Sequence, residues 1–161
     1  DAGALNLEKT LTDPVKLLER ICGDFQPKFS EAGIELTFGA EPGIAQLNID
    51  PARINQVINN LLQNSLRHTP QGGHVETAIR SLPGEVLIQI RDSGEGIPQE
   101  ALPHLFERFY RSDQARSRDK GGTGLGLTIA QQLVQAHGGR LTAAMGLDGG
   151  AVFEIRLPAA A

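Results

Sequence analysis

The chain has 161 residues, of which 40% are apolar and 21% charged, and its formal net charge is −4. These values are typical of one globular domain that buries a core without disulfides, and they give no reason to expect contact with nucleic acid or an acidic membrane surface. Cys22 has no second cysteine to pair with, so we expect a reducing, cytoplasmic setting. No apolar run approaches the ~18 residues of a membrane span. The chain begins at Asp1, and we interpret it as a segment of a longer protein that could carry a membrane anchor elsewhere.

The first half predicts two helices that each begin with an Asp-Pro pair, at residues 13–14 and 50–51. Asp as N-cap and Pro at the first helical position are typical of a helix start. Residues 1–12 are short and mixed, and we expect them to be a linker. The predicted elements are a helix that begins at 13 and is stopped by Gly33, a strand over 34–38 with alternating apolar residues, a short strand over 47–49 and a helix over 51–68.

The second half predicts a hairpin, a long irregular segment, a helix and a final strand pair. Residues 92–122 show no sustained period, and irregular segments of this length are usually functional lids or disordered. The predicted elements are strands over 74–81 and 85–91, a helix over about 124–137, and strands over 140–146 and 151–157. This order predicts an α/β fold, a two-layer sandwich of one mixed sheet with its helices on one face.

The helix over 51–68 carries a polar stripe beside its apolar stripe, formed by Asn60, Asn64, Arg67 and His68. Amide oxygens are suitable ligands for Mg²⁺, and Arg and His donate to phosphate oxygens. The alternative interpretation is an ordinary solvated helix face.

The run VLIQIRDSGEGIP, residues 86–98, leads from a strand directly into a turn. Asp92 at the strand end could accept a hydrogen bond from an exocyclic amine such as that of adenine, and Gly94 and Gly96 would let a flat ring approach the backbone. The alternative is a plain turn with Asp as its first residue.

The segment LFERFYRSD, residues 105–113, places aromatic residues between arginines, and five of the fifteen residues 106–120 are Arg or Lys. A cationic lid with Phe109, Tyr110 and Arg111 suits closure over a polyphosphate. The alternative is an ordinary surface loop, and we expect the aromatic side chains to pack on the domain in either case.

The run GGTGLGL, residues 121–127, precedes a predicted helix. Backbone N–H groups at a helix start form an anion site. The run is not a P-loop, because no G-x-x-x-x-G-K-[ST] is present, and it is not a dinucleotide fingerprint, because Leu127 stands where the third glycine would be needed.

These segments, in this order and spacing, resemble the catalytic and ATP-binding domain of sensor histidine kinases over residues 13–158. NLLQNSLRHTP is similar to the N box of that family, DSGEGIP to the first glycine box, LFERFYRSD to the F box, GGTGLGL to the second glycine box, and GGAVFEIRLP to the last strand pair. The resemblance implies the Bergerat fold, a mostly antiparallel sheet of about five strands on three helices, shared with DNA gyrase, a class of chaperones and mismatch-repair ATPases. It also implies that residues 94–123 form the ATP lid.

The resemblance further implies ATP and Mg²⁺ as ligands. Asp92 would hold the adenine amine, Asn64 would bind Mg²⁺ with Asn60 beside it, and Asn60, Asn64, Arg67 and Arg111 would be catalytic. The implied nucleotide-binding residues are Asn60, Asn64, Arg67, His68, Asp92, Gly94, Gly96, Ile97, Phe109, Tyr110, Gly122, Thr123, Gly124, Leu125, Gly126 and Leu127.

Hydrolytic relatives have a Glu at the position of Asn60, which cannot take a proton at neutral pH. A site without a general base suits phosphoryl transfer to an external nucleophile. None of the four histidines lies in the family's acceptor context; His137 reads as structural. We therefore expect the partners to be an upstream dimerisation and phosphoacceptor domain and a response regulator. We expect this segment to be a monomer without direct membrane contact, and the whole protein a homodimer.

Two other interpretations stay open. One is a serine/threonine anti-sigma kinase of the same superfamily, against which the F box and Asn60 argue. The other is a degenerate module that holds a nucleotide or only a partner protein, against which the intact Asp92, Asn64 and glycines argue.

Overall fold

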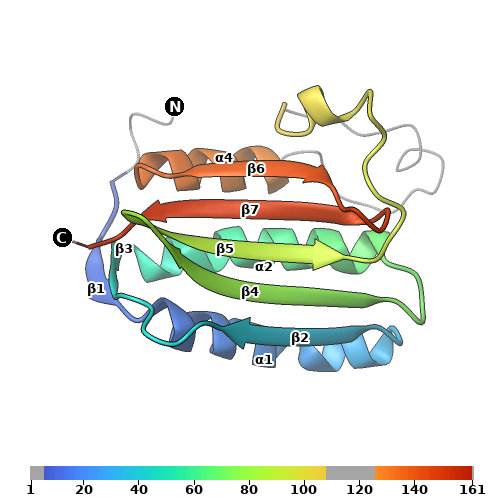
Figure 1. Ribbon diagram of the computed structural model, residues 1–161, viewed down its shortest axis with the longest axis horizontal. Helices are drawn as coiled ribbons and strands as arrows, with labels where there is room; N and C mark the ends of the chain where they lie inside the picture. Colours follow the sequence, from blue (N-terminus) through green and yellow to red (C-terminus); the bar gives the residue numbers. More distant parts are fainter. Residues whose placement is uncertain (1–5, 108–125, 161) are drawn as a thin grey trace.

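In a computed structural model, residues 6–107 and 126–160 are described, and they form two layers (Figure 1). A five-stranded sheet of order β2-β4-β5-β7-β6 forms one layer, and helices α1, α2 and α4 cover one of its faces. Strands β2 and β4 are parallel, and the other neighbouring pairs are antiparallel. The predicted two-layer α/β sandwich is therefore confirmed.

The elements are β1 (Thr10–Thr12), α1 (Pro14–Glu31), β2 (Glu35–Ala40), β3 (Leu47–Ile49), α2 (Pro51–His68), β4 (His74–Leu82), β5 (Glu85–Asp92), the short 3-10 helix η2 (Leu102–His104), α4 (Gly126–Ala136), β6 (Arg140–Met145) and β7 (Ala151–Pro158).

Both Asp-Pro pairs start helices as predicted. The Asp13 Oδ1 atom accepts hydrogen bonds from the backbone N–H groups of Val15 and Lys16 at 2.9 and 3.2 Å. Asp50 Oδ1 accepts from the N–H of Arg53 at 3.3 Å. Each carboxylate thus satisfies N–H groups that the first helical turn leaves without a partner. Within the described ranges, no helix combines the length and the apolar character needed to cross a bilayer.

Helix α2 lies between α1 and α4 and contributes the centre of the core (Figure 1). Its predicted apolar stripe is buried, and it packs in the same cluster as alternate residues of β5 and β7. The polar stripe of α2 is only half-buried, because it lies beside the core rather than in it. The stripe residues are Ile54, Val57, Ile58, Leu61, Leu62 and the buried Ser65, and the strand residues packed with the apolar ones include Ile88, Ile90, Phe153 and Ile155.

One strand was not predicted. Residues 10–12, which we expected to belong to a linker, form β1, and β1 pairs antiparallel with β3 in a separate two-stranded sheet. The predicted strand over 47–49 therefore lies outside the main sheet. A three-residue strand offers too few positions for an alternating pattern, and Leu11 is 64% exposed, so hydrophobic periodicity could not reveal β1.

Asp50 also connects distant parts of the chain. Its backbone N–H donates to His137 Nε2 at 3.1 Å, and His137 Nδ1 lies 2.7 Å from the Leu133 carbonyl oxygen. Because Nε2 accepts, the neutral imidazole ring carries its proton on Nδ1 and donates it to that carbonyl. Asp50 Oδ2 accepts from the N–H of Glu8 at 2.9 Å. His137 is buried, which confirms its predicted structural role.

We expect the substitution Asp50→Ala to lower the free energy of unfolding by about 1–2 kcal/mol, since it removes the N-cap of α2 and the partner of the Glu8 amide. Urea denaturation would measure the loss. Asp50→Asn keeps an oxygen acceptor at the cap and should lose less. An Asp50→Ala variant as stable as the parent protein would contradict this role.

Candidate active site

Three elements meet at the end of the sheet where β5 finishes, which we call the site edge: the second half of α2, the loop after β5 and the start of α4 (Figure 1). Asn60 Nδ2 donates a hydrogen bond to the Gly126 carbonyl oxygen at 3.1 Å, which joins α2 to the first residue of α4. His68 Nδ1 lies 3.1 Å from Glu95 Oε1, which joins the end of α2 to the loop. The structure therefore gathers at one edge residues that the sequence separates by up to 66 positions.

Asp92 is the buried centre of this edge. It ends β5, and 2% of its surface is exposed. Its Oδ1 atom accepts hydrogen bonds from the backbone N–H groups of Gly94 at 2.9 Å and Ala151 at 3.2 Å. Burial raises the pKa of the Asp92 carboxyl, while these two donors and the nearby His68 oppose the rise. The two bonds fix the carboxyl group and are both made through Oδ1.

The glycines that follow Asp92 are required by close contacts within the protein. A Cβ atom on Gly94 would collide with the His68 carbonyl oxygen. Gly96 has a φ of +77°, and a Cβ atom there would collide with the Gly149 carbonyl oxygen. The sequence predicts that these glycines let a flat ring approach the backbone. The structure shows a separate reason for them, because they let the loop pack against α2 and the β6–β7 connection.

The four residues of the predicted polar stripe lie together in the second half of α2 and are all half-buried: Asn60, Asn64, Arg67 and His68. Among the residues that the structure describes, no group of three or more His, Cys, Asp or Glu side chains could hold a metal ion. A metal in this region could still take one or two protein oxygens together with oxygens of a ligand or of water. Asn64, half-buried on the stripe, offers an amide oxygen.

The remaining predicted site residues divide into two groups. Ile97 is buried in the loop after β5, and Gly126 and Leu127 begin α4. The others lie outside the described residues, as does the end of the predicted lid from residue 108 onward. They are Phe109, Tyr110, Arg111, Gly122, Thr123, Gly124 and Leu125.

Sequence reasoning missed the contribution of the β6–β7 connection. Gly150 packs so closely on the backbone of Asp92 that a Cβ atom would overlap the Asp92 carbonyl oxygen, and Ala151 supplies one of the two hydrogen bonds to the carboxylate. The pair Gly149-Gly150 predicts only a turn. Nothing in the local pattern could show that this turn lies against a residue almost 60 positions earlier.

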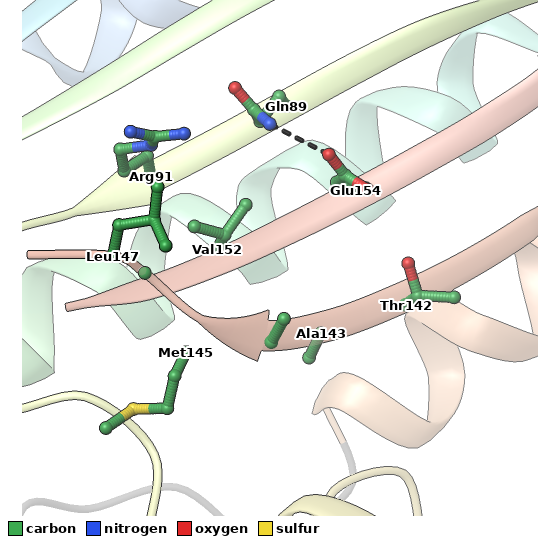
Figure 2. A pocket seen from close by; sticks show the side chains of 10 residues that line it. Gln89, Arg91, Thr142, Ala143, Met145, Leu147, Val152 and Glu154 are labelled. Carbon is green, nitrogen blue, oxygen red and sulfur yellow. Dashed lines mark hydrogen bonds between the residues drawn. The ribbon is translucent and has the colours of Figure 1, made fainter. Parts of the chain in front are cut away.

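A shallow hollow on the open face of the sheet is distinct from this site (Figure 2). Polar and apolar residues of β5, β6, β7 and the β6–β7 turn line it, and Gln89 on β5 donates a hydrogen bond to Glu154 on the neighbouring β7 at 2.8 Å. None of the predicted site residues lines the hollow. The hollow therefore gives no support to a binding role at the predicted site.

Comparison with known proteins identifies the family to which this fold belongs. Residues 49–161 match the family described as histidine kinase-, DNA gyrase B- and HSP90-like ATPases. The chain belongs to this family, and its fold is that of the catalytic domains of sensor histidine kinases.

Individual relatives agree with this assignment. The signal transduction histidine-protein kinase BaeS of Escherichia coli is 39% identical over 98% of this chain. A full-length structure of ShkA in complex with AMPPNP has a TM-score of 0.86 and 27% identity over 99% of this chain and 34% of that one. The nucleotide-free catalytic domain of the histidine kinase ThkA has a TM-score of 0.84 and 26% identity, over 95% of this chain and 99% of that one. The chain spans about a third of the length of BaeS.

Proposed function

We propose that this chain is the domain of a sensor histidine kinase that binds Mg-ATP and donates the γ-phosphoryl group to a histidine on a separate domain. The observation that carries the proposal is the buried Asp92 carboxylate, held at the same edge as the polar stripe of α2 and the start of α4. A buried carboxylate must find partners. Among the described residues Asp92 accepts hydrogen bonds from two backbone donors, both at Oδ1, and its placement suits recognition of a ligand amine.

Adenine recognition follows from the geometry at Asp92. The Gly94 and Ala151 amides orient the carboxyl group through Oδ1, so Oδ2 is available to accept a hydrogen bond from the 6-amino group of adenine. Such a charge-assisted bond is stronger than a neutral one. Guanine carries an oxygen at the corresponding ring position and would repel the carboxylate, so the site should prefer ATP to GTP.

The residues present fit a magnesium ion bound mainly through the nucleotide. Mg²⁺ usually keeps several waters and takes only one or two protein oxygens in nucleotide sites, so the absence of an acidic cluster from the described residues is compatible with it. The Asn64 amide oxygen would be the protein ligand. When bound, the ion would neutralise charge on the phosphate oxygens during transfer.

Asn60 favours transfer to another protein group over hydrolysis. Its amide nitrogen donates to the Gly126 carbonyl oxygen, and an amide cannot accept a proton at neutral pH. Without a base at this position, water near the γ-phosphate is not activated. A histidine imidazole is already a nucleophile in its neutral form, and phosphoryl transfer needs mainly positioning and charge stabilisation from the protein.

The proposed partners lie outside this chain. We infer an upstream dimerisation and phosphoacceptor domain, joined through the residues before β1 to a catalytic domain that includes β1 and extends to residue 158, and a response regulator that receives the phosphoryl group. ThkA, whose catalytic domain this chain resembles, is known in a complex with the response regulator TrrA. Within the whole protein we place this domain in the cytoplasm.

Calorimetric titration with ATP and with GTP, each with and without Mg²⁺, tests nucleotide binding by this chain. We expect ATP to bind more tightly than GTP, since adenine offers the buried Asp92 a donor at its 6 position, where guanine has an oxygen acceptor. Binding of neither nucleotide, or equal binding of both, would contradict the proposed role of Asp92.

A further inference from the structure

We propose that Met145 and the β6–β7 turn (residues 146–150) form a brace that holds the Asp92–Ile97 loop in the conformation needed to recognise adenine. Met145 would be a positioning residue, acting on ATP through this loop without touching the nucleotide. The inference rests on the proposed function and adds a specificity-determining element to the same site.

The first part of the brace lies behind Asp92. Gly150 is packed against the Asp92 carbonyl, in a space that no side chain could share. The next residue, Ala151, donates its N–H to Asp92 Oδ1 at 3.2 Å. The turn thereby fixes both the backbone and the carboxyl group of Asp92.

The second part lies four to five residues further along the loop. The N–H of Ile97 donates to Met145 Sδ at 3.1 Å. A Cβ atom on Gly96 would come within 2.8 Å of the same sulfur. Met145 also lines the rim of the hollow on the open face of the sheet, where Figure 2 shows its side chain. Met145 thus contacts two consecutive residues of the loop, although 48% of its surface is exposed.

The contacts of Met145 satisfy a buried backbone N–H group, which is a role beyond apolar packing. Ile97 is 6% exposed, so its N–H group needs an acceptor, and a thioether is a weak one. Of the large apolar residues in this region, Leu147 is fully exposed, whereas Met145 is directed onto the loop. The loop over residues 93–97 has no strand or helix of its own. Its path is therefore held by the turn, by Met145 and by the 3.1 Å contact between Glu95 Oε1 and His68 Nδ1.

The brace predicts an effect that depends on the 6-amino group of adenine. If Met145 acts by positioning Asp92 and its loop, its removal should weaken the contact between Asp92 and that amine. A purine riboside triphosphate, which lacks the amine, makes no such contact and should be affected little. A merely structural role would lower binding of both nucleotides together.

The test is calorimetric titration of the chain and of Met145→Ala with ATP and with purine riboside triphosphate. We expect Met145→Ala to weaken ATP binding roughly fivefold, the equivalent of one hydrogen bond, and to change binding of the analogue less than twofold. Leu147→Ala, in the same turn, is the matched control and should change neither. Met145→Leu keeps the apolar volume but loses the sulfur acceptor, so it should also weaken ATP binding. It replaces Met145→Ala in the test if that variant does not fold.

Two results would overturn the brace: unchanged ATP binding in both Met145 variants, or equal loss of ATP and of the analogue. Failure of the parent chain to bind ATP would instead contradict the proposed function, so the two failures are distinguishable. The melting temperature of each variant shows whether it is folded during the titration.

Discussion

Asp92→Asn should weaken ATP binding by about tenfold to a hundredfold, because an amide replaces the charged acceptor of the adenine amine. The loss should be confined to nucleotides with a 6-amino group. Calorimetric titration with ATP measures it, and Asp24→Asn, an exposed acid on α1, provides a control with the same change of charge.

The same substitution should not destabilise the fold. The side-chain oxygen of Asn can still accept from Gly94 and Ala151, and the burial that raises the pKa of Asp92 penalises only the charged carboxylate. A raised pKa in the folded state means that stability falls as the pH rises through that value. At neutral pH we therefore expect Asp92→Asn to melt at the same temperature as the parent protein or higher, with the difference shrinking in acid. Unchanged ATP binding, or a loss of binding explained by unfolding, would contradict the assignment.

Asn64→Ala should lower the rate of phosphoryl transfer about a hundredfold or more, since the reaction depends on charge stabilisation and positioning of the phosphates. ATP binding measured without Mg²⁺ should change little, because Asp92 is intact. Transfer from ATP to a phosphoacceptor domain supplied in trans, followed over a range of Mg²⁺ concentrations, measures the effect.

Gln63→Ala is the matched control for Asn64→Ala. Gln63 is the preceding residue on α2 and also carries an amide, but it is exposed rather than turned toward the polar stripe. It should transfer at the parent rate. Parent-like transfer by Asn64→Ala, or an equal loss in Gln63→Ala, would remove the metal-binding assignment of Asn64.

Local patterns predicted the parts of the fold that depend on neighbours in sequence. The Asp-Pro pairs marked the starts of α1 and α2, and the stripe of Ile54 to Leu62 marked the buried face of α2, because capping and helical periodicity are local properties. The polar stripe and Asp92 were predicted as one site from four motifs in order. The structure brings the described members of these motifs to one edge.

Contacts between distant segments could not be predicted in the same way. The residues that flank the β6–β7 turn supply hydrogen bonds to the loop, Ala151 to Asp92 and Met145 to Ile97, yet they lie 48 to 59 residues away along the chain. The pairing of β1 with β3 was missed for the same reason. The requirement for Gly94 and Gly96 was visible in the sequence, but its cause, a backbone packed against His68 and Gly149, appears only when the chain is folded.

The most direct test of the central claim is to incubate the parent chain with γ-labelled Mg-ATP and phosphoacceptor domains taken from two histidine kinase relatives. We predict transfer of the label to those domains as a phosphoramidate, which is labile in acid and stable in base. Label that is stable in acid would indicate a hydroxyl acceptor and favour a serine/threonine kinase. ATP binding with no transfer to either domain would contradict the account and favour a module that only binds nucleotide.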